Sequence, residues 1–164
     1  MQKINLSKNK VIIIPNEIGN CANLNTLIIS SNIIEELPLE FDNLSRLHKC
    51  DLHDTQIKQI PSTFGLLCNL KHCNLNNNKI DCVPCEFGNL CNLKYADLSL
   101  NNISLILCNF NEMHNLQRLN LSNNKLATIP KSLKIQWLQT YNNHIACGSN
   151  IACDIMTNDQ LIDV

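Results

Sequence analysis

The chain has 164 residues, which is enough for one domain or for a short array of repeats. Its hydrophobic content of 45% excludes a disordered chain, and its formal net charge of −1 excludes a strong overall attraction to nucleic acid or to acidic membranes. The longest aliphatic run near the start covers only residues 11–14, so we expect neither a membrane span nor an export signal. The ten cysteines are then expected to be free thiols in the reducing cytoplasm.

An internal repeat of fixed length runs through most of the chain. Leu, Ile and Asn together supply 72 of the 164 residues, and they recur in the pattern Leu-x-x-(Leu or Cys)-x-Leu-x-x-Asn. The repeats start at positions 1, 24, 47, 70, 93, 116 and 135, so the interval between starts is constant except for a shorter last one. The spacing predicts seven repeats over residues 1–145 and an irregular C-terminal cap or tail over residues 146–164.

Each repeat begins with a predicted strand at its positions 3 to 5, and neighbouring strands pair in parallel about 4.8 Å apart. Positions 4, 6 and 11 are apolar and should point inward, so that each coil covers the next. At position 9 an Asn amide can bond backbone groups that the turn would otherwise bury without partners. Thr55 interrupts this column, and we expect a local weakness there. The column consists of Asn9, Asn32, Asn78, Asn101, Asn124 and Asn143.

The second half of each repeat is predicted to form an outer arc. Position 15 is Pro in five repeats, which favours a turn, and position 18 is Phe in four, which predicts a stack of rings on the convex side. The predicted fold is therefore an α/β curved solenoid, with a parallel β-sheet on the concave face and short helices, 3-10 turns and loops on the convex face. Because Met1 stands at position 1 without a polar cap, we also expect an exposed strand edge or a longer parent chain.

These columns resemble leucine-rich repeats over roughly residues 1 to 145. The form Leu-x-x-Leu-x-Leu-x-x-Asn-x-Ile-x-x-Ile-Pro-x-x-Phe looks most like the intracellular 23-residue class, which includes the Ras-suppressor and Ras-binding scaffold proteins and the scribble-type polarity proteins. The resemblance implies a signalling scaffold, with small GTPases among the partners. Repeats of this class are also similar to those joined to phosphatase or cyclase domains, so a recognition domain of a larger enzyme is the alternative.

The predicted concave face carries most of the positive charge. Positions 2, 3, 5, 7, 8 and 10 hold nine cations and three anions, whereas the rest of the chain holds four cations and eleven anions. Position 3 adds Tyr, Arg and Trp, the residue types that dominate interface energies. We therefore predict a site for an acidic or mixed-charge protein surface, and the interspersed Asp residues disfavour specific nucleic-acid binding. The predicted site comprises Lys49, Asp51, Lys71, His72, Lys94, Tyr95, Asp97, Arg118 and Trp137.

Other candidate sites are weaker. Trp137 can alternatively pack under the C-terminal cap. Cys82 and Cys85 have the spacing of a zinc half-site or a redox pair, but no second pair follows, so ordinary packing or surface thiols are favoured. Cys147 and Cys153 are only faintly similar to the cysteine caps of secreted relatives. The five histidines have no activated Ser or Cys nearby in sequence, so we expect no enzyme activity, metal or cofactor.

Overall fold

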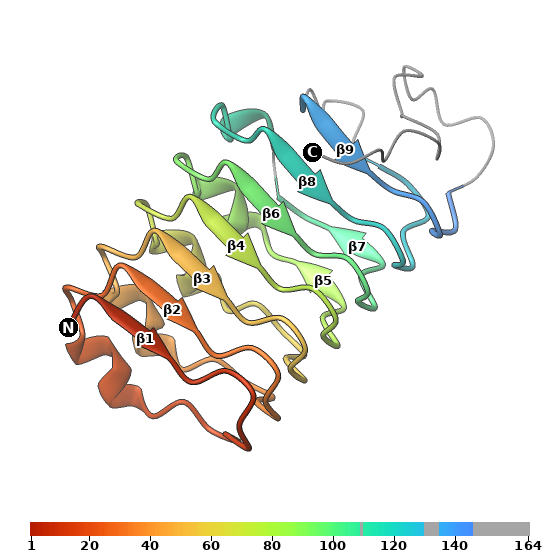
Figure 1. Ribbon diagram of the computed structural model, residues 1–164. Helices are drawn as coiled ribbons and strands as arrows, with labels where there is room; N and C mark the ends of the chain where they lie inside the picture. The colour runs from red at the N-terminus through yellow and green to blue at the C-terminus, as the bar shows by residue number, and fades with distance from the viewer. Residues whose placement is uncertain (109, 130–134, 146–164) are drawn as a thin grey trace, which may run out of the picture.

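The computed structural model describes residues 1–108, 110–129 and 135–145. Seven three-residue strands form one parallel sheet, and the coils lie side by side as a curved solenoid (Figure 1). The predicted fold is confirmed. In sheet order the strands are β1 (Lys3–Asn5), β2 (Thr26–Ile28), β3 (Lys49–Asp51), β4 (His72–Asn74), β6 (Tyr95–Asp97), β8 (Arg118–Asn120) and β9 (Trp137–Gln139).

The register of this sheet follows the sequence period. Each strand residue pairs with the residue at the same position of the next repeat, as Lys49 does with His72 and Tyr95 with Arg118. The shorter last repeat keeps this register, and Arg118 pairs with Trp137. Residues of one column of the repeat therefore lie next to one another across the sheet.

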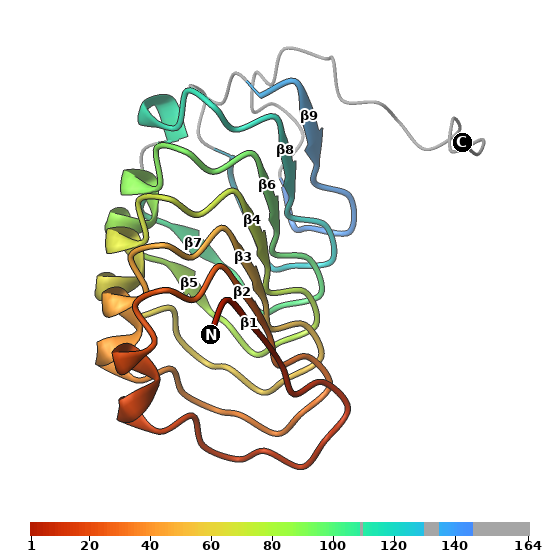
Figure 2. The same ribbon diagram turned by 60° about the vertical axis from the view of Figure 1, so that its left-hand side comes forward.

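Five 3-10 helices form the side opposite the sheet (Figure 2). Four of them start directly after the Pro of position 15, which has an extended backbone and ends the preceding segment. Gly65 lets η3 and η4 approach closely, since a Cβ atom on it would clash with the carbonyl oxygen of Glu86. The helices are η1 (Asn16–Asn20), η2 (Leu39–Asn43), η3 (Ser62–Leu66), η4 (Cys85–Asn89) and η5 (Phe110–Glu112).

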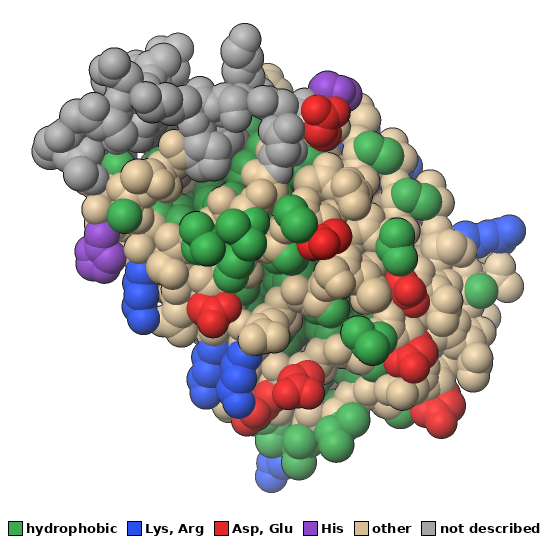
Figure 3. Space-filling model, turned by 180° about the vertical axis from the view of Figure 1, so that it is seen from behind, with side chains coloured by type: hydrophobic (Ala, Val, Ile, Leu, Met, Phe, Trp, Pro, Cys, Tyr) green, Lys and Arg blue, Asp and Glu red, His purple; other side chains and the backbone are tan. Residues whose placement is uncertain are grey.

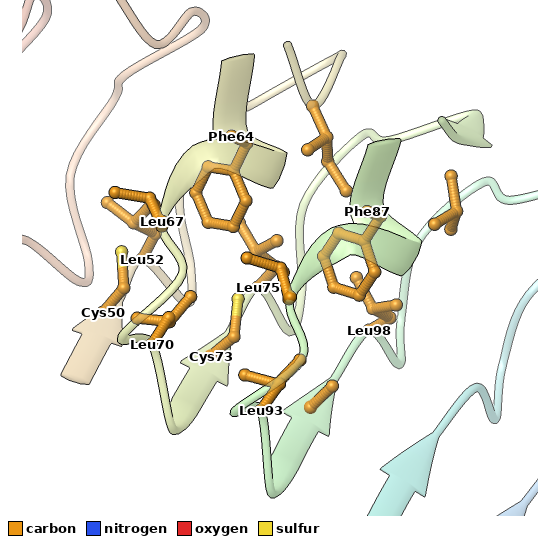
Figure 4. Close-up of a cluster of buried hydrophobic side chains, with 14 of the residues drawn as sticks. Cys50, Leu52, Phe64, Leu67, Leu70, Cys73, Leu75, Phe87, Leu93 and Leu98 are labelled. Atoms are coloured by element: carbon orange, nitrogen blue, oxygen red, sulfur yellow. The ribbon is translucent and has the colours of Figure 1, made fainter. Parts of the chain in front are cut away.

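The core fills the space between sheet and 3-10 helices (Figure 4). Phe64 lies between Phe41 and Phe87 at ring-centroid distances of 6.0 and 6.3 Å, which confirms the expected stack. Cys50 and Cys73 replace Leu at position 4 and are 1% and 4% exposed, so they act as small hydrophobic residues. The inward expectation is wrong for Leu6, which is 45% exposed because it lies at the outer end of the sheet.

A second, two-stranded sheet on the outer arc was not expected. It pairs β5 (Cys82–Val83) with β7 (Leu105–Ile106) in parallel. Position 15 of this repeat is Leu107 and not Pro, and the Leu107 N–H donates to the carbonyl of Val83 at 2.9 Å. Proline has no such N–H, so this substitution supplies an additional bond between the two coils.

The Asn column bonds neighbouring coils. Asn32 is typical: its Nδ2 donates to the carbonyls of Leu6, Ile29 and Ser30, and its Oδ1 accepts from the Val11 N–H at 2.9 Å. Asn78, Asn101 and Asn124 repeat the pattern, and Asn143 of the last coil also bonds to the coil before it. Asn9, in the first coil, bonds only within its own coil.

Thr55 makes fewer of these bonds, as expected from the replacement of Asn by Thr at this position of the repeat. Its Oγ1 lies 3.1 Å from the Leu52 carbonyl and 2.5 Å from Asn78 Oδ1. Among the described residues, the N–H of Ile34 makes no hydrogen bond. At the equivalent positions of other coils, this N–H donates to the side-chain oxygen of an Asn, as it would to an Asn at position 55.

We expect Thr55→Asn to stabilise the protein. The longer side chain would supply an acceptor to Ile34 and a donor to Ile29, so the free energy of unfolding should rise by about 1 kcal/mol. Urea denaturation followed by circular dichroism measures it. An unchanged or lower stability would mean that the coils cannot accommodate the amide.

Position 8 of each described coil adopts the left-handed backbone conformation, which the repeat pattern does not predict. Asn occupies this position in three coils, and Leu100, with a φ of 55°, is the least suited residue because a left-handed conformation is costly for side chains other than Gly, Asn and Asp. The seven residues are Lys8, Ser31, Asp54, Asn77, Leu100, Asn123 and Asn142.

Replacing Leu100 with Asn should therefore stabilise the protein by about 1 kcal/mol. Leu100 is 48% exposed, so little core packing is lost. Asn123→Leu, which makes the opposite change one coil later, should destabilise. Thermal unfolding of both variants tests the assignment, and two shifts of the same sign would contradict it.

Candidate partner-binding face

Four side chains of the predicted site form a continuous stack across the sheet. His72, Tyr95, Arg118 and Trp137 are consecutive members of the position-3 column, from strands β4, β6, β8 and β9. We call these four residues the aromatic ladder. The period of the repeat brings them together, as the sequence predicts.

The ladder alternates rings and a cation. The rings of His72 and Tyr95 are nearly parallel, with centroids 4.8 Å apart. The guanidinium carbon of Arg118 lies 5.8 Å from the centroid of Tyr95 and 5.9 Å from that of Trp137, within the range of cation–π attraction. The Tyr95 hydroxyl donates to Gln117 Oε1 at 3.1 Å. These contacts hold large, partly exposed side chains in one arrangement before any partner binds.

Lysines surround the His72 end of the ladder. Partial burial lowers the pKa of His72 below its usual value, and the charges of Lys49, Lys94 and Lys71 lower it further. Within the described ranges, the ion pairs join His53 to Asp51 and Asp54 and Lys58 to Glu35, so these three lysines and Arg118 have no carboxylate partner there.

The two aspartates of the predicted site have carboxylates that are already hydrogen-bonded. Asp51 Oδ1 accepts from Nδ1 of His53 at 2.7 Å, and Asp97 Oδ1 accepts from the backbone N–H and the hydroxyl of Ser99. Asn5, Asn74 and Asn120 make the same contact from position 5 to position 7. The frequent Asn or Asp at position 5 could have revealed this role in shaping the turn. The concave face therefore keeps its cations available while its anions are satisfied internally.

The side away from the sheet carries many of the acidic side chains. Figure 3 shows them spread over the outer arcs, with several Lys and Arg side chains among them. The nearly neutral total charge does not reveal this distribution.

The cysteine pair has the environment of ordinary thiols. Cys82 is partly buried and Cys85 is exposed. Burial raises the pKa of Cys82, and a hydrogen bond with Glu86 raises that of Cys85, so both thiols are protonated at neutral pH and are poor nucleophiles. Cys147 and Cys153, like the C-terminal cap, lie outside the described residues.

The part of the chain that is described contains no candidate metal site and no candidate membrane helix. No group of three or more His, Cys, Asp or Glu side chains there is arranged to hold a metal ion. Among the same residues, no helix has both the length and the apolar character needed to cross a membrane.

Part of the chain matches a known repeat family. The family model described as "Leucine Rich Repeat" matches residues 69–90 and 115–135. A comparison with curated protein sequences finds no match.

Solved structures share the same solenoid. The chain is 29% identical to a leucine-rich repeat protein of Leptospira interrogans, with a TM-score of 0.67, over 87% of this chain and 43% of that one. It is 26% identical to the ectodomain of the Arabidopsis thaliana membrane receptor kinase GASSHO1/SCHENGEN3, solved with Casparian strip integrity factor 2, with a TM-score of 0.80 over 90% of this chain and 19% of that one. A TDR receptor is 27% identical, with a TM-score of 0.75 over 80% of this chain and 24% of that one. The chain thus spans less than half the length of each.

Proposed function

We propose that this leucine-rich repeat solenoid is a non-catalytic module that binds a protein partner through its concave face. The observation that carries the proposal is the aromatic ladder, because it presents Tyr, Arg and Trp side chains in a fixed stack beside cations that lack carboxylate partners in the described part of the chain. Side chains of these types, already ordered, lose little conformational freedom on binding and supply most of the energy of protein interfaces.

The receptor ectodomain adds support for a polypeptide ligand. That structure was determined in complex with Casparian strip integrity factor 2, and its repeats superimpose on this chain. A stack of such coils offers a long surface to which another polypeptide can bind.

A narrower proposal concerns the biological setting. The resemblance to the Ras-suppressor and scaffold class supports a cytoplasmic role in signal transduction, with a small GTPase as partner, and the ten cysteines are consistent with a reducing compartment. Binding of purified small GTPases, each loaded with GDP or a non-hydrolysable GTP analogue, tests it. A dependence on the bound nucleotide supports the proposal, and equal weak binding of both forms contradicts it.

A second candidate is a recognition domain within a larger enzyme of the phosphatase or cyclase type. The observation in its favour is that the chain spans only 19–43% of the three similar structures, one of which belongs to a receptor kinase. Sequencing the flanking reading frame distinguishes this candidate from a separate scaffold.

The double substitution Arg118→Glu with Tyr95→Ala tests the binding face. It removes the centre of the ladder and reverses one charge, so we expect partner capture from the native cell to fall by more than about tenfold. Quantitative mass spectrometry of material retained by the immobilised protein measures the loss.

The control is Arg46→Glu, since Arg46 is the only other arginine and lies outside the predicted site. Both variants should unfold at nearly the temperature of the original protein, because the replaced side chains are not part of the core. Capture that survives the double substitution, or that is lost equally in the control, would place the binding site elsewhere.

A further inference from the structure

Four of the nine cations at the predicted concave positions lie on four successive coils, next to or within the aromatic ladder. Lys49 and Arg118 are the position-3 residues of β3 and β8, and Lys71 and Lys94 directly precede β4 and β6. We call these four residues the cation row. Each of the four coils contributes one member of the cation row, and neighbouring coils are about 4.8 Å apart, so the row extends over about 14 Å.

The positive charges of the row form no ion pair in the described part of the chain. Partial burial lowers the pKa of His72, and the charges of the row members Lys49, Lys94 and Lys71 lower it further. The nearby carboxylates of Asp51 and Asp97 already accept hydrogen bonds from their own turns.

The ladder restricts the chemistry of the ligand. The ring of His72 lies against that of Tyr95, and the guanidinium of Arg118 lies between Tyr95 and Trp137. Within the aromatic ladder, the ring faces that point toward a neighbouring side chain are already in contact with it. Nucleic-acid bases or sugar rings therefore cannot insert between the four side chains. The Lys and Arg groups that remain are cationic hydrogen-bond donors, and they favour anionic oxygens such as those of carboxylates.

We propose that the partner presents an acidic α-helix, which lies along the solenoid axis with one carboxylate per turn over the cation row. A helix rises about 5.4 Å per turn, so four carboxylates on one face span about 16 Å. Alternate residues of an extended strand are about 6.7 Å apart, and four of them span about 20 Å. The mismatch with the row is about 2 Å for a helix and about 6 Å for a strand, so a helix requires less splaying of the lysine side chains. This inference rests on the proposed function and specifies the partner.

Synthetic peptides of equal length and equal number of glutamates, long enough for four helical turns, test the geometry. The first is a stapled helix with its glutamates on one face at successive turns. The second is a stapled helix with the glutamates distributed around its axis, and the third is extended by prolines, with glutamates at alternate residues. Fluorescence anisotropy should show the first peptide binding about tenfold more tightly than the other two.

Substitutions locate the binding. Lys71→Met with Lys94→Met should weaken binding of the first peptide by about tenfold, because the variant nearly keeps the length of both side chains but loses their charge. Lys58→Met is the control, because Lys58 pairs with Glu35 away from the row. The first peptide should also raise the pKa of His72, measured by NMR, since its carboxylates offset the charges of Lys49, Lys71 and Lys94.

Equal affinity for the three peptides, or an unchanged pKa of His72, would overturn the acidic helix. So would preferential binding of heparin or single-stranded DNA that disappears at moderate salt, because that behaviour marks nonspecific charge attraction. If the peptides do not discriminate while Arg118→Glu with Tyr95→Ala still abolishes partner capture, only the helix inference fails. If capture persists in that variant, the proposed function fails.

Discussion

Replacing Phe64 with Ala is expected to destabilise the protein by about 3–5 kcal/mol. The ring is fully buried and stacks on both Phe41 and Phe87, so its removal leaves a cavity bordered by two other rings. The 3-10 helices that carry the rings are packed closely around Gly65, which limits how far they can collapse into the space. The cost should therefore lie at the upper end of the range for large-to-small changes.

Leu66→Ala is the matched control, since Leu66 belongs to the same 3-10 helix but is 59% exposed. It should change the free energy of unfolding by less than about 0.5 kcal/mol. Guanidinium denaturation of both variants measures the difference. Similar values for the two would show that the Phe column does not bear on the stability of the coils.

The period of the sequence was sufficient to predict the sheet, because a strand that recurs at a fixed interval can bury its apolar face only against its own neighbours. The prediction that Tyr95 and Arg118 lie side by side follows from that repeat and is confirmed. Sequence alone could not show that the side chains would stack, since the stack depends on rotamers set by neighbours on the sheet. Position 3 shows which residue types are adjacent, and the structure adds how they touch.

Local backbone chemistry was harder to predict. The left-handed residue at position 8 is Lys, Ser, Asp, Asn or Leu in different coils, and this variety hides the requirement in a single sequence. The pairing of β5 with β7 depends on one missing proline, at Leu107. From the sequence, Asp51 and Asp97 could either shape the turn after their strand or contact a partner. Their short hydrogen bonds to His53 and Ser99 favour the role in the turn. Their place in the binding site stays a prediction.

The Asn column has the second large expected effect. Asn78→Ala should destabilise the protein by about 1–3 kcal/mol, because buried backbone groups lose their partners. Asn78 Oδ1 accepts from the N–H of Ile57 and the hydroxyl of Thr55, and its Nδ2 donates to the carbonyls of Leu52 and Leu75. Since Thr55 makes few bonds to the coil before it, the loss of Asn78 would leave two adjacent coils poorly bonded.

Asn9→Ala is the natural comparison, since Asn9 holds the same column but is exposed and bonds only to Leu6 and Ser7. It should cost less than about 0.5 kcal/mol. Hydrogen exchange gives the sharper measurement: in Asn78→Ala the amide of Ile57 should lose protection, whereas that of Ile103, bonded to Asn124, should keep it. A uniform loss in both coils would show that the solenoid unfolds as one cooperative unit and does not weaken locally at the coil that contains Thr55.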